Sequence, residues 1–214
     1  MYRAPIMIVD LKIGNNVWKL ATRVVDLWIV KDRNGQQHFE GVLQDNKCDK
    51  MHVVTRNRDF DLWKQRLREH QTVMVYNGDP LNNDLALKVC DNPLKLVFNG
   101  GTTVTVVDMP EMYAYQFCFK PIVDFSRGDF RVNRLYDVIG VLHEIVKTQV
   151  AGGGKKACVN LVIFDEIGSE IDMTLWEAYA TQFMAYTNEK TTHGPTIIVI
   201  THAMCQQSSG NVCY

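Results

Sequence analysis

Hydrophobic and polar residues alternate in two stretches of this chain that repeat at an offset of 120 residues. VLQDNKCDKMHVVTR at 42–56 and VIFDEIGSEIDMTLW at 162–176 align without a gap, and each reads as two alternating runs around a polar turn. A period of two is typical of a half-buried strand, and two such runs around a polar turn indicate a β-hairpin. Each copy is therefore predicted to contain a β-hairpin.

The segments around the two hairpins also correspond. A long strand pattern precedes each hairpin, and a helical pattern with Trp63 or Phe183 at the same offset follows it. The predicted strands outside the hairpins lie at 18–30, 72–77 and 94–99 in the first copy, and at 137–150 and 196–203 in the second. Five strands with one helix between the third and the fourth describe an OB barrel.

We therefore predict a mainly β protein that contains two tandem OB-fold barrels, each a five-stranded Greek key. The expected organisation is a first domain over 1–102, a linker over 103–119 and a second domain over 120–214. Little chain remains after the fourth strand of the second copy. Its barrel is expected to be incomplete, with an unpaired edge that another segment or chain could cover.

One motif of the second hairpin suggests a different function. LVIFDEIG at 161–168 looks like the strand of nucleotide hydrolases that ends in a magnesium-binding Asp-Glu pair, but the phosphate-binding loop such enzymes need is missing. The nearest candidate, GGGKKA at 152–157, has the wrong spacing and lacks a Ser or Thr. We predict no enzyme activity and no cofactor or metal. Asp165 aligns with Asp45, and both are predicted to shape their hairpin turns by accepting backbone N–H bonds.

Charge and cysteine content narrow the class of protein. The formal net charge is −1, divided into +3 over residues 1–107 and −4 over 108–214, so a polyanion is expected to contact mainly the first half. The six cysteines contain no C-x-x-C pair, which suits reduced thiols in the cytosol or nucleus. No apolar run reaches the length of a membrane span, so no membrane partner is expected.

Several segments together resemble a known family. WKLATRVV at 18–25, VLQDNKCDKMHVV at 42–54, QFCFKPIVDF at 116–125, LYDVIGVLHEI at 135–145 and TLWEAYATQF at 174–183 are similar to the tandem central DNA-binding OB domains of the replication protein A large subunit, most closely its plant paralogues. This resemblance implies single-stranded DNA binding without strong sequence preference, in a groove across both barrels. It also implies a nuclear role in DNA replication, recombination or repair, with other replication protein A subunits or repair proteins as further partners.

The resemblance also assigns individual residues. Phe39 and Trp176 match the family's base-stacking aromatics, and Arg23 matches a basic position of the first strand. The further candidates for nucleic-acid binding are basic residues of the predicted loops: Lys31, Arg33, Lys88, Lys155 and Lys156. Each has a plainer interpretation, because an aromatic ring of a strand can belong to the core and a charged loop residue is often only solvated.

Three family positions are not filled here. The second stacking aromatic of each domain falls on Leu87 and about Ser208, and a basic position falls on Met204. Fewer stacking platforms predict weaker binding than the family standard, or none. The alternative is a diverged OB-fold protein-interaction module with little or no nucleic-acid binding.

Overall fold

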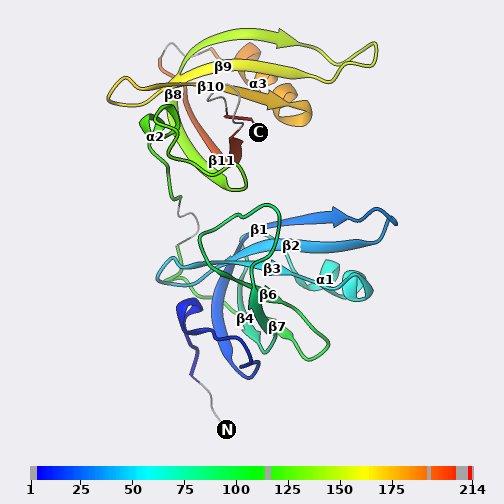
Figure 1. Ribbon diagram of the computed structural model, residues 1–214. Helices are drawn as coiled ribbons and strands as arrows, with labels where there is room; N and C mark the ends of the chain where they lie inside the picture. Colours follow the sequence, from blue (N-terminus) through cyan, green and yellow to red (C-terminus); the bar gives the residue numbers. More distant parts are fainter. Residues whose placement is uncertain (1–3, 114–116, 192–193, 206–211, 214) are drawn as a thin grey trace. The chain divides into compact units, whose positions relative to one another are not determined.

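The computed structural model describes residues 4–113, 117–191, 194–205 and 212–213. The chain divides into two compact units, residues 1–116 and 117–214, each built around its own β-sheet (Figure 1).

The first unit is a curved sheet with one short α-helix. Its strands are β1 (Lys19–Lys31), β2 (Gln37–Gln44), β3 (Lys50–Val54), β4 (Thr72–Tyr76), β5 (Asp79–Asn82), β6 (Leu94–Val97) and β7 (Thr103–Val106). Its helices are the 3-10 turns η1 (Ile8–Asp10) and η2 (Asn57–Asp59), and α1 (Phe60–Arg66). The hydrogen-bonded order is β5-β6-β3-β2-β1-β4-β7, and β6 runs parallel to β3.

Alternation along the strands builds the core of the first unit. Trp18, Leu20, Thr22 and Val24 of the β1 region are buried, whereas the residues that alternate with them are half-buried. Trp63 of α1 is fully buried and packs its ring 4.9 Å from that of Phe98. Helix α1 therefore closes one end of this core, which is the place of the helix between the third and fourth strands of an OB fold.

The second unit repeats this arrangement. It comprises α2 (Ile122–Ser126), β8 (Leu135–Gln149), β9 (Cys158–Phe164), β10 (Glu170–Trp176), α3 (Glu177–Glu189), β11 (Ile197–Cys205) and β12 (Val212–Cys213). The strands form a closed barrel in the order β10-β12-β11-β8-β9, and β12 runs parallel to β10. Helix α3 follows β10 and precedes β11, so both units have their helix between the third and fourth OB strands.

The predicted fold class is confirmed: the protein is mainly β and consists of two OB folds in series. The predicted role of the two aspartates is confirmed as well. Asp45 Oδ1 accepts backbone N–H bonds from Lys47 at 2.9 Å and Asp49 at 3.1 Å. Asp165 Oδ1 accepts the corresponding bonds from Ile167 at 3.1 Å and Ser169 at 2.8 Å.

Two details differ from the sequence analysis. The second barrel has no unpaired edge between β10 and β11, because the two-residue strand β12 hydrogen-bonds to both of them. The predicted linker, 103–119, begins too early, since Thr103–Val106 pairs with β4 as strand β7. Both differences involve strands of two to four residues, which are too short to produce a visible alternation in the sequence.

Candidate nucleic-acid interface

OB folds bind oligonucleotides on the outward face of their second and third strands, between the loops that follow the first and fourth strands. In the first unit this face belongs to β2 and β3, with the β1–β2 loop and the chain between β4 and β6 beside it. In the second unit it belongs to β9 and β10, beside the β8–β9 loop.

Phe39 does not lie on this face. Its side chain is 6% exposed, belongs to the core of the first unit, and stacks on the ring of Phe60 with centroids 4.8 Å apart and planes 9° from parallel. A base cannot stack on a buried ring, so the structure does not support Phe39 as a stacking platform. The pattern contained a signal for this, because Phe39 and Leu43 are four residues apart on one strand and therefore share a face.

Arg23 points outward, as its alternation with Val24 predicts, but its guanidinium is already bound. Nη1 donates to the carbonyl of His70, and Nη2 donates to the carbonyl of Met112 at 2.7 Å. The first bond ties the segment between α1 and β4 to β1, and the second ties the end of the first unit to it. They leave the guanidinium committed to the fold, so the structure does not support Arg23 as a phosphate contact.

The outward face of β2 and β3 is covered. Val42 and His52 are only 1% exposed, although neither belongs to the core inside the sheet. The loop between β5 and β6 carries buried side chains of its own, at Val89 and Cys90. Asn92 Nδ2 of that loop donates to the carbonyl of Lys50 on β3 at 3.2 Å, and Figure 1 shows the loop crossing the strands. This loop therefore folds over the face where an OB ligand would lie.

Lys88 belongs to this loop and helps to hold it. Its Nζ donates to the carbonyl of Asn83 at 2.6 Å, and Asn83 N donates to the carbonyl of Pro93 at 2.8 Å, which closes the neck of the loop. Lys88 is therefore a structural residue of the loop in this conformation, rather than a phosphate contact. Leu87 beside it is exposed, so it offers an apolar side chain without a stacking ring.

A carboxylate between two histidines lies on the same outward face. Glu40 Oε1 is 3.2 Å from His38 Nε2, and Glu40 Oε2 is 3.1 Å from His52 Nε2. Burial raises the pKa of Glu40, but the hydrogen bonds from His52 and His38 and their charges together lower it by more. The pKa of Glu40 therefore lies below its ordinary value of 4.5, and the group is anionic at neutral pH. His38 and Glu40 share a face of β2, whereas His52 joins them only through the β2–β3 register, so the cluster was not predicted from the sequence.

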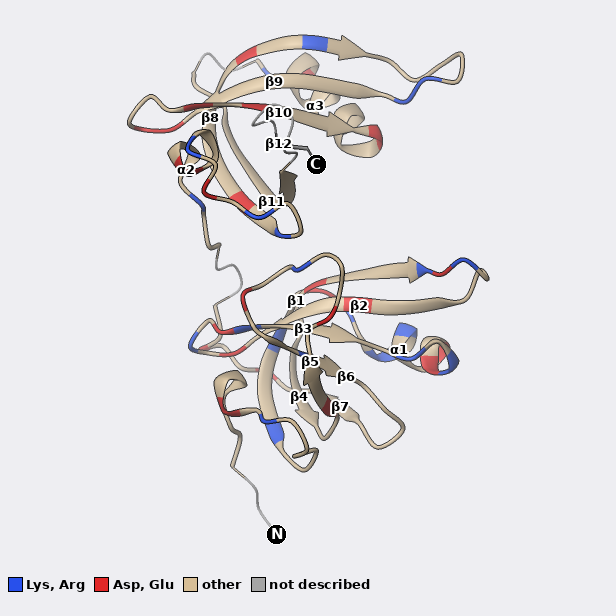
Figure 2. Ribbon diagram, in the orientation of Figure 1, with Lys and Arg blue, Asp and Glu red and all other residues tan. Residues whose placement is uncertain are grey.

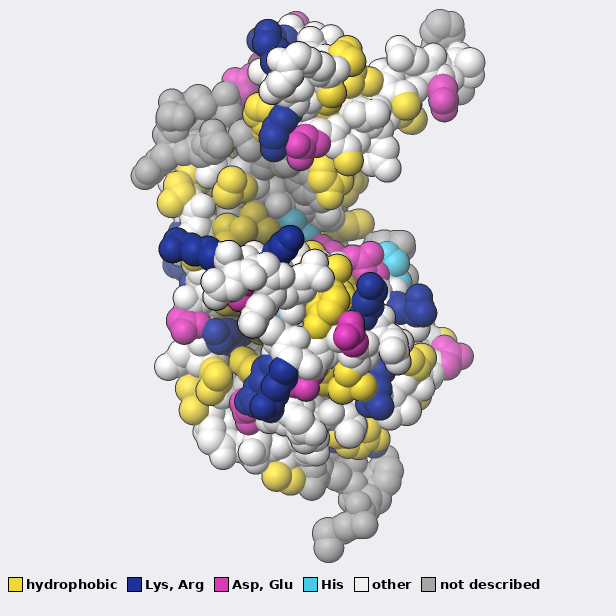
Figure 3. Space-filling view, turned by 90° about the vertical axis from the view of Figure 1, so that its right-hand side faces the viewer, with side chains coloured by type: hydrophobic (Ala, Val, Ile, Leu, Met, Phe, Trp, Pro, Cys, Tyr) yellow, Lys and Arg dark blue, Asp and Glu magenta, His cyan; other side chains and the backbone are white. Residues whose placement is uncertain are grey.

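Lys31 and Arg33 are exposed at the β1–β2 loop, where the sequence analysis expected them. The loop is ordered by Asp32, whose Oδ1 accepts the backbone N–H of Asn34 and that of Gln36, both at 2.9 Å. Viewed from the side in Figure 3, the basic side chains of the first unit are interspersed with acidic ones and form no continuous strip. The two basic residues are thus available for phosphate contacts, but only as part of a mixed surface.

Trp176 occupies the outward face of the second unit. The inward residues of β10 are buried at Ile171, Met173 and Leu175, and Trp176 follows them with the opposite orientation and 41% of its surface exposed. It pairs with Cys158 on β9, which pairs in turn with Gln149 on β8. These three paired residues lie at the loop end of the β8–β9 hairpin. The indole of Trp176 is therefore open to a stacking partner at this end.

Basic residues surround this end of the face. The next row pairs Thr174 with Asn160 and Asn160 with Lys147, which is exposed. Lys155 and Lys156 are exposed on the β8–β9 loop, which carries basic positions in Figure 2. Lys156 Nζ forms an ion pair with Glu177 Oε1 at 2.9 Å. The structure therefore brings Trp176, Lys155 and Lys156 together, and adds Lys147, which the sequence analysis did not nominate.

The other end of the same face is acidic. The third row pairs Asp172 with Val162 and Val162 with Glu144, and Glu170 begins β10 one row further on. Glu170 Oε1 lies 3.9 Å from His143 Nε2. Charge therefore changes sign along the face, so a polyanion is attracted only to the end that carries Trp176.

Met204 is exposed on β11, while Ser208 lies outside the described residues. No group of three or more His, Cys, Asp or Glu within the described ranges could hold a metal ion. No helix of the described chain is long and apolar enough to cross a membrane.

No family model matches the sequence, and no curated protein matches it. Among solved structures, a replication protein A heterotrimer bound to single-stranded DNA is similar with a TM-score of 0.57 and 16% identity, over 93% of this chain and 47% of that one. The chain thus spans about half the length of that protein. The DNA-binding domain A of S. cerevisiae replication protein A is similar with a TM-score of 0.40 and 16% identity, over 50% of this chain and 97% of that one. The Ifi202 HINa domain bound to 20-bp duplex DNA is similar with a TM-score of 0.45 and 11% identity, over 93% of this chain and 92% of that one.

At this level of identity, the first likeness shows the OB fold and nothing finer. The function of the chain therefore has to be argued from its own residues.

Proposed function

We propose that the chain binds single-stranded DNA without strong sequence preference, through base stacking and phosphate contacts on its OB folds. The observation that carries this proposal is the exposed indole of Trp176 on the outward face of β10, beside Lys147, Lys155 and Lys156. Every base has a π face and every nucleotide a phosphate, so an open ring flanked by cations binds a strand whatever its sequence.

The proposed role is stoichiometric coverage of exposed single strands in the nucleus during DNA replication, recombination or repair, without catalysis. The OB folds in series and the sequence segments that resemble those of the replication protein A large subunit support this assignment, and a replication protein A heterotrimer bound to single-stranded DNA has a similar fold. Other replication protein A subunits or repair proteins are the proposed protein partners.

The first test is fluorescence anisotropy of a labelled oligo(dT) of about 30 nucleotides, long enough to span two OB folds. The same length of duplex serves as the control, and both are titrated over a salt series. We expect salt-dependent binding to the single strand and much weaker binding to the duplex. If the single strand is not bound even at low salt, the proposed function is wrong.

A second candidate function is a protein-interaction module. Two observations favour it: the β5–β6 loop covers the outward face of the first unit, and acidic residues occupy half of the corresponding face of the second. This candidate predicts that the oligonucleotide titration is flat. It also predicts that a protein partner with a basic surface is released when Glu144 and Asp172 are changed to Gln and Asn.

A further inference from the structure

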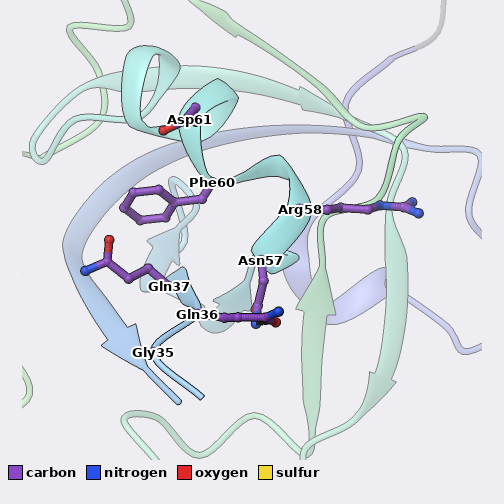
Figure 4. Close-up of a pocket in the computed structure, with 7 residues that line it drawn as sticks. All are labelled: Gly35, Gln36, Gln37, Asn57, Arg58, Phe60 and Asp61. Carbon is purple, nitrogen blue, oxygen red and sulfur yellow. Dashed lines mark hydrogen bonds between the residues drawn. The ribbon is translucent and has the colours of Figure 1, made fainter. Parts of the chain in front are cut away.

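A pocket of about 390 Å³ lies in the first unit between the β1–β2 loop and the start of helix α1 (Figure 4). Its lining consists of Gly35, Gln36, Gln37, Asn57, Arg58, Phe60 and Asp61. None of these residues was nominated from the sequence. We infer that this pocket binds one unstacked nucleobase of the strand, against Phe60, and that it favours adenine. The inference rests on the proposed function and adds a base preference to it.

Phe60 is a preformed stacking surface. One side of its ring is held against Phe39, with centroids 4.8 Å apart and planes 9° from parallel, and Phe39 belongs to the buried core. Figure 4 shows the Phe60 ring projecting into the pocket toward the side chain of Gln37. A ring fixed in this way loses little conformational entropy when a base stacks on it. Lys64 Nζ lies over the Phe60 ring, 6.0 Å from its centroid, so a base that stacks on Phe60 takes the place of this exposed, flexible side chain.

Neutral amides provide the polar part of the pocket. Asn57 Nδ2 donates to Gln36 Oε1 at 3.0 Å and to Asp32 Oδ2 at 3.4 Å, which ties helix η2 to the β1–β2 loop and fixes one wall. Gln37 is exposed and carries one donor and one acceptor group at the end of its side chain. A side-chain amide pairs bidentately with N6 and N7 of adenine, and an unstacked base presents that edge freely.

The size and charge of the pocket also suit a base rather than a phosphate. A volume of about 390 Å³ is at the lower end for small-molecule sites, which fits a single nucleoside. Asp61 lines the pocket and repels a phosphate, whereas Arg58 directs its guanidinium away from Phe60 in Figure 4. The base therefore enters the pocket while its phosphates remain outside.

Two variants test the pocket, with one matched control. Phe60→Leu keeps an apolar side chain against Phe39 but removes the π face, and Gln37→Ala removes the amide. Gln65→Ala is the control, because Gln65 is an exposed glutamine of α1 that does not line the pocket. Each protein is titrated with oligo(dT) and with the same length of oligo(dT) that contains dispersed dA residues.

The wild type and Gln65→Ala are expected to bind the dA-containing strand about 5-fold or more tightly, since a bidentate side-chain contact to one base discriminates against the wrong base by at least that factor. Phe60→Leu and Gln37→Ala are expected to bind both strands equally. Equal binding by the wild type, or a preference retained in both variants, overturns the inference.

A second measurement separates this inference from the proposed function. In ¹⁵N-edited NMR, dAMP is expected to shift the side-chain amide signals of Gln37 and Asn57 more than dTMP does. If no oligonucleotide binds but dAMP shifts these signals, the proposed function fails and the pocket remains a nucleobase site. If dAMP leaves the signals unchanged, the pocket inference is wrong, whatever the oligonucleotide titration shows.

Discussion

Substitution of Trp176 tests whether the outward face of the second unit binds DNA. The indole is 41% exposed and follows the buried inward residues of β10, so a base can reach it without any rearrangement of the barrel. Stacking of one base on an aromatic ring is worth about 1–3 kcal/mol. Because about 1.4 kcal/mol corresponds to a tenfold change in Kd, Trp176→Leu is expected to weaken oligo(dT) binding about 5- to 150-fold.

The design separates stacking from packing. Leucine preserves an apolar side chain for the buried part of the site, and Trp176→Phe keeps a π face, so it should retain most of the affinity. Tyr186→Ala is the control, since Tyr186 is an aromatic of α3 in the same unit with a similar exposure of 50%. Anisotropy with oligo(dT) measures Kd, and thermal unfolding checks that each variant is folded. If Trp176→Leu binds as tightly as the wild type while folded, Trp176 is not a stacking platform and the reasoning fails.

Three further outcomes are expected. Replacing Lys155 and Lys156 together by Ala should reduce the slope of log K against log salt by about 1.4, if each contacts one phosphate of a single strand; an unchanged slope would exclude both contacts. Glu40→Gln should lower the free energy of unfolding above pH 4.5, because a carboxylate whose pKa is depressed in the folded state stabilises the fold there. The loss of stability should disappear as the pH falls through the pKa of Glu40 in the folded state. Urea unfolding of both proteins from pH 7 to 3 measures this loss, and a loss that is independent of pH contradicts the prediction. Cys90 of the β5–β6 loop is 5% exposed, so its thiol should be modified no faster in saturating oligo(dT) if the loop stays closed. Faster modification of Cys90, with an unchanged rate at the buried Cys158, would show that DNA opens the loop.

The parts of the fold that could be predicted are those whose signal is periodic or repeated. The alternation of hydrophobic and polar residues located the long strands. The repeat at an offset of 120 residues aligned Asp45 with Asp165, so the same turn was predicted at both aspartates. Alternation also predicts the orientation of Trp176, because Leu175 before it is an inward residue. These features depend on neighbours within a few positions along the chain, and a single sequence records such neighbours directly.

The residues that were misjudged depend on contacts made in the folded chain, and most of these contacts join distant parts of the sequence. Arg23 was correctly placed on the outside of β1, but the carbonyl of Met112 that occupies it lies 89 positions later. Lys88 is turned inward by the neck of its own loop. Strand β12 is too short to show an alternation of hydrophobic and polar residues. It is a strand because its backbone pairs with β10 on one side and with β11 on the other. Tertiary contacts of this kind cannot be read from local spacing.

The two copies use the same face in different ways, and this difference bears on how a strand can bind. In the first copy the β5–β6 loop covers the face, and the proposed contact lies away from it, at the pocket lined by Phe60, whose ring stacks on the core residue Phe39. In the second copy Trp176, Lys147, Asp172 and Glu144 of the face are exposed, but the two acidic residues confine a polyanion to the end that carries Trp176. Each unit thus offers one restricted contact in place of a long groove. Because two weak contacts on one chain reinforce each other through effective concentration, we expect appreciable affinity only for a strand that engages both units at once.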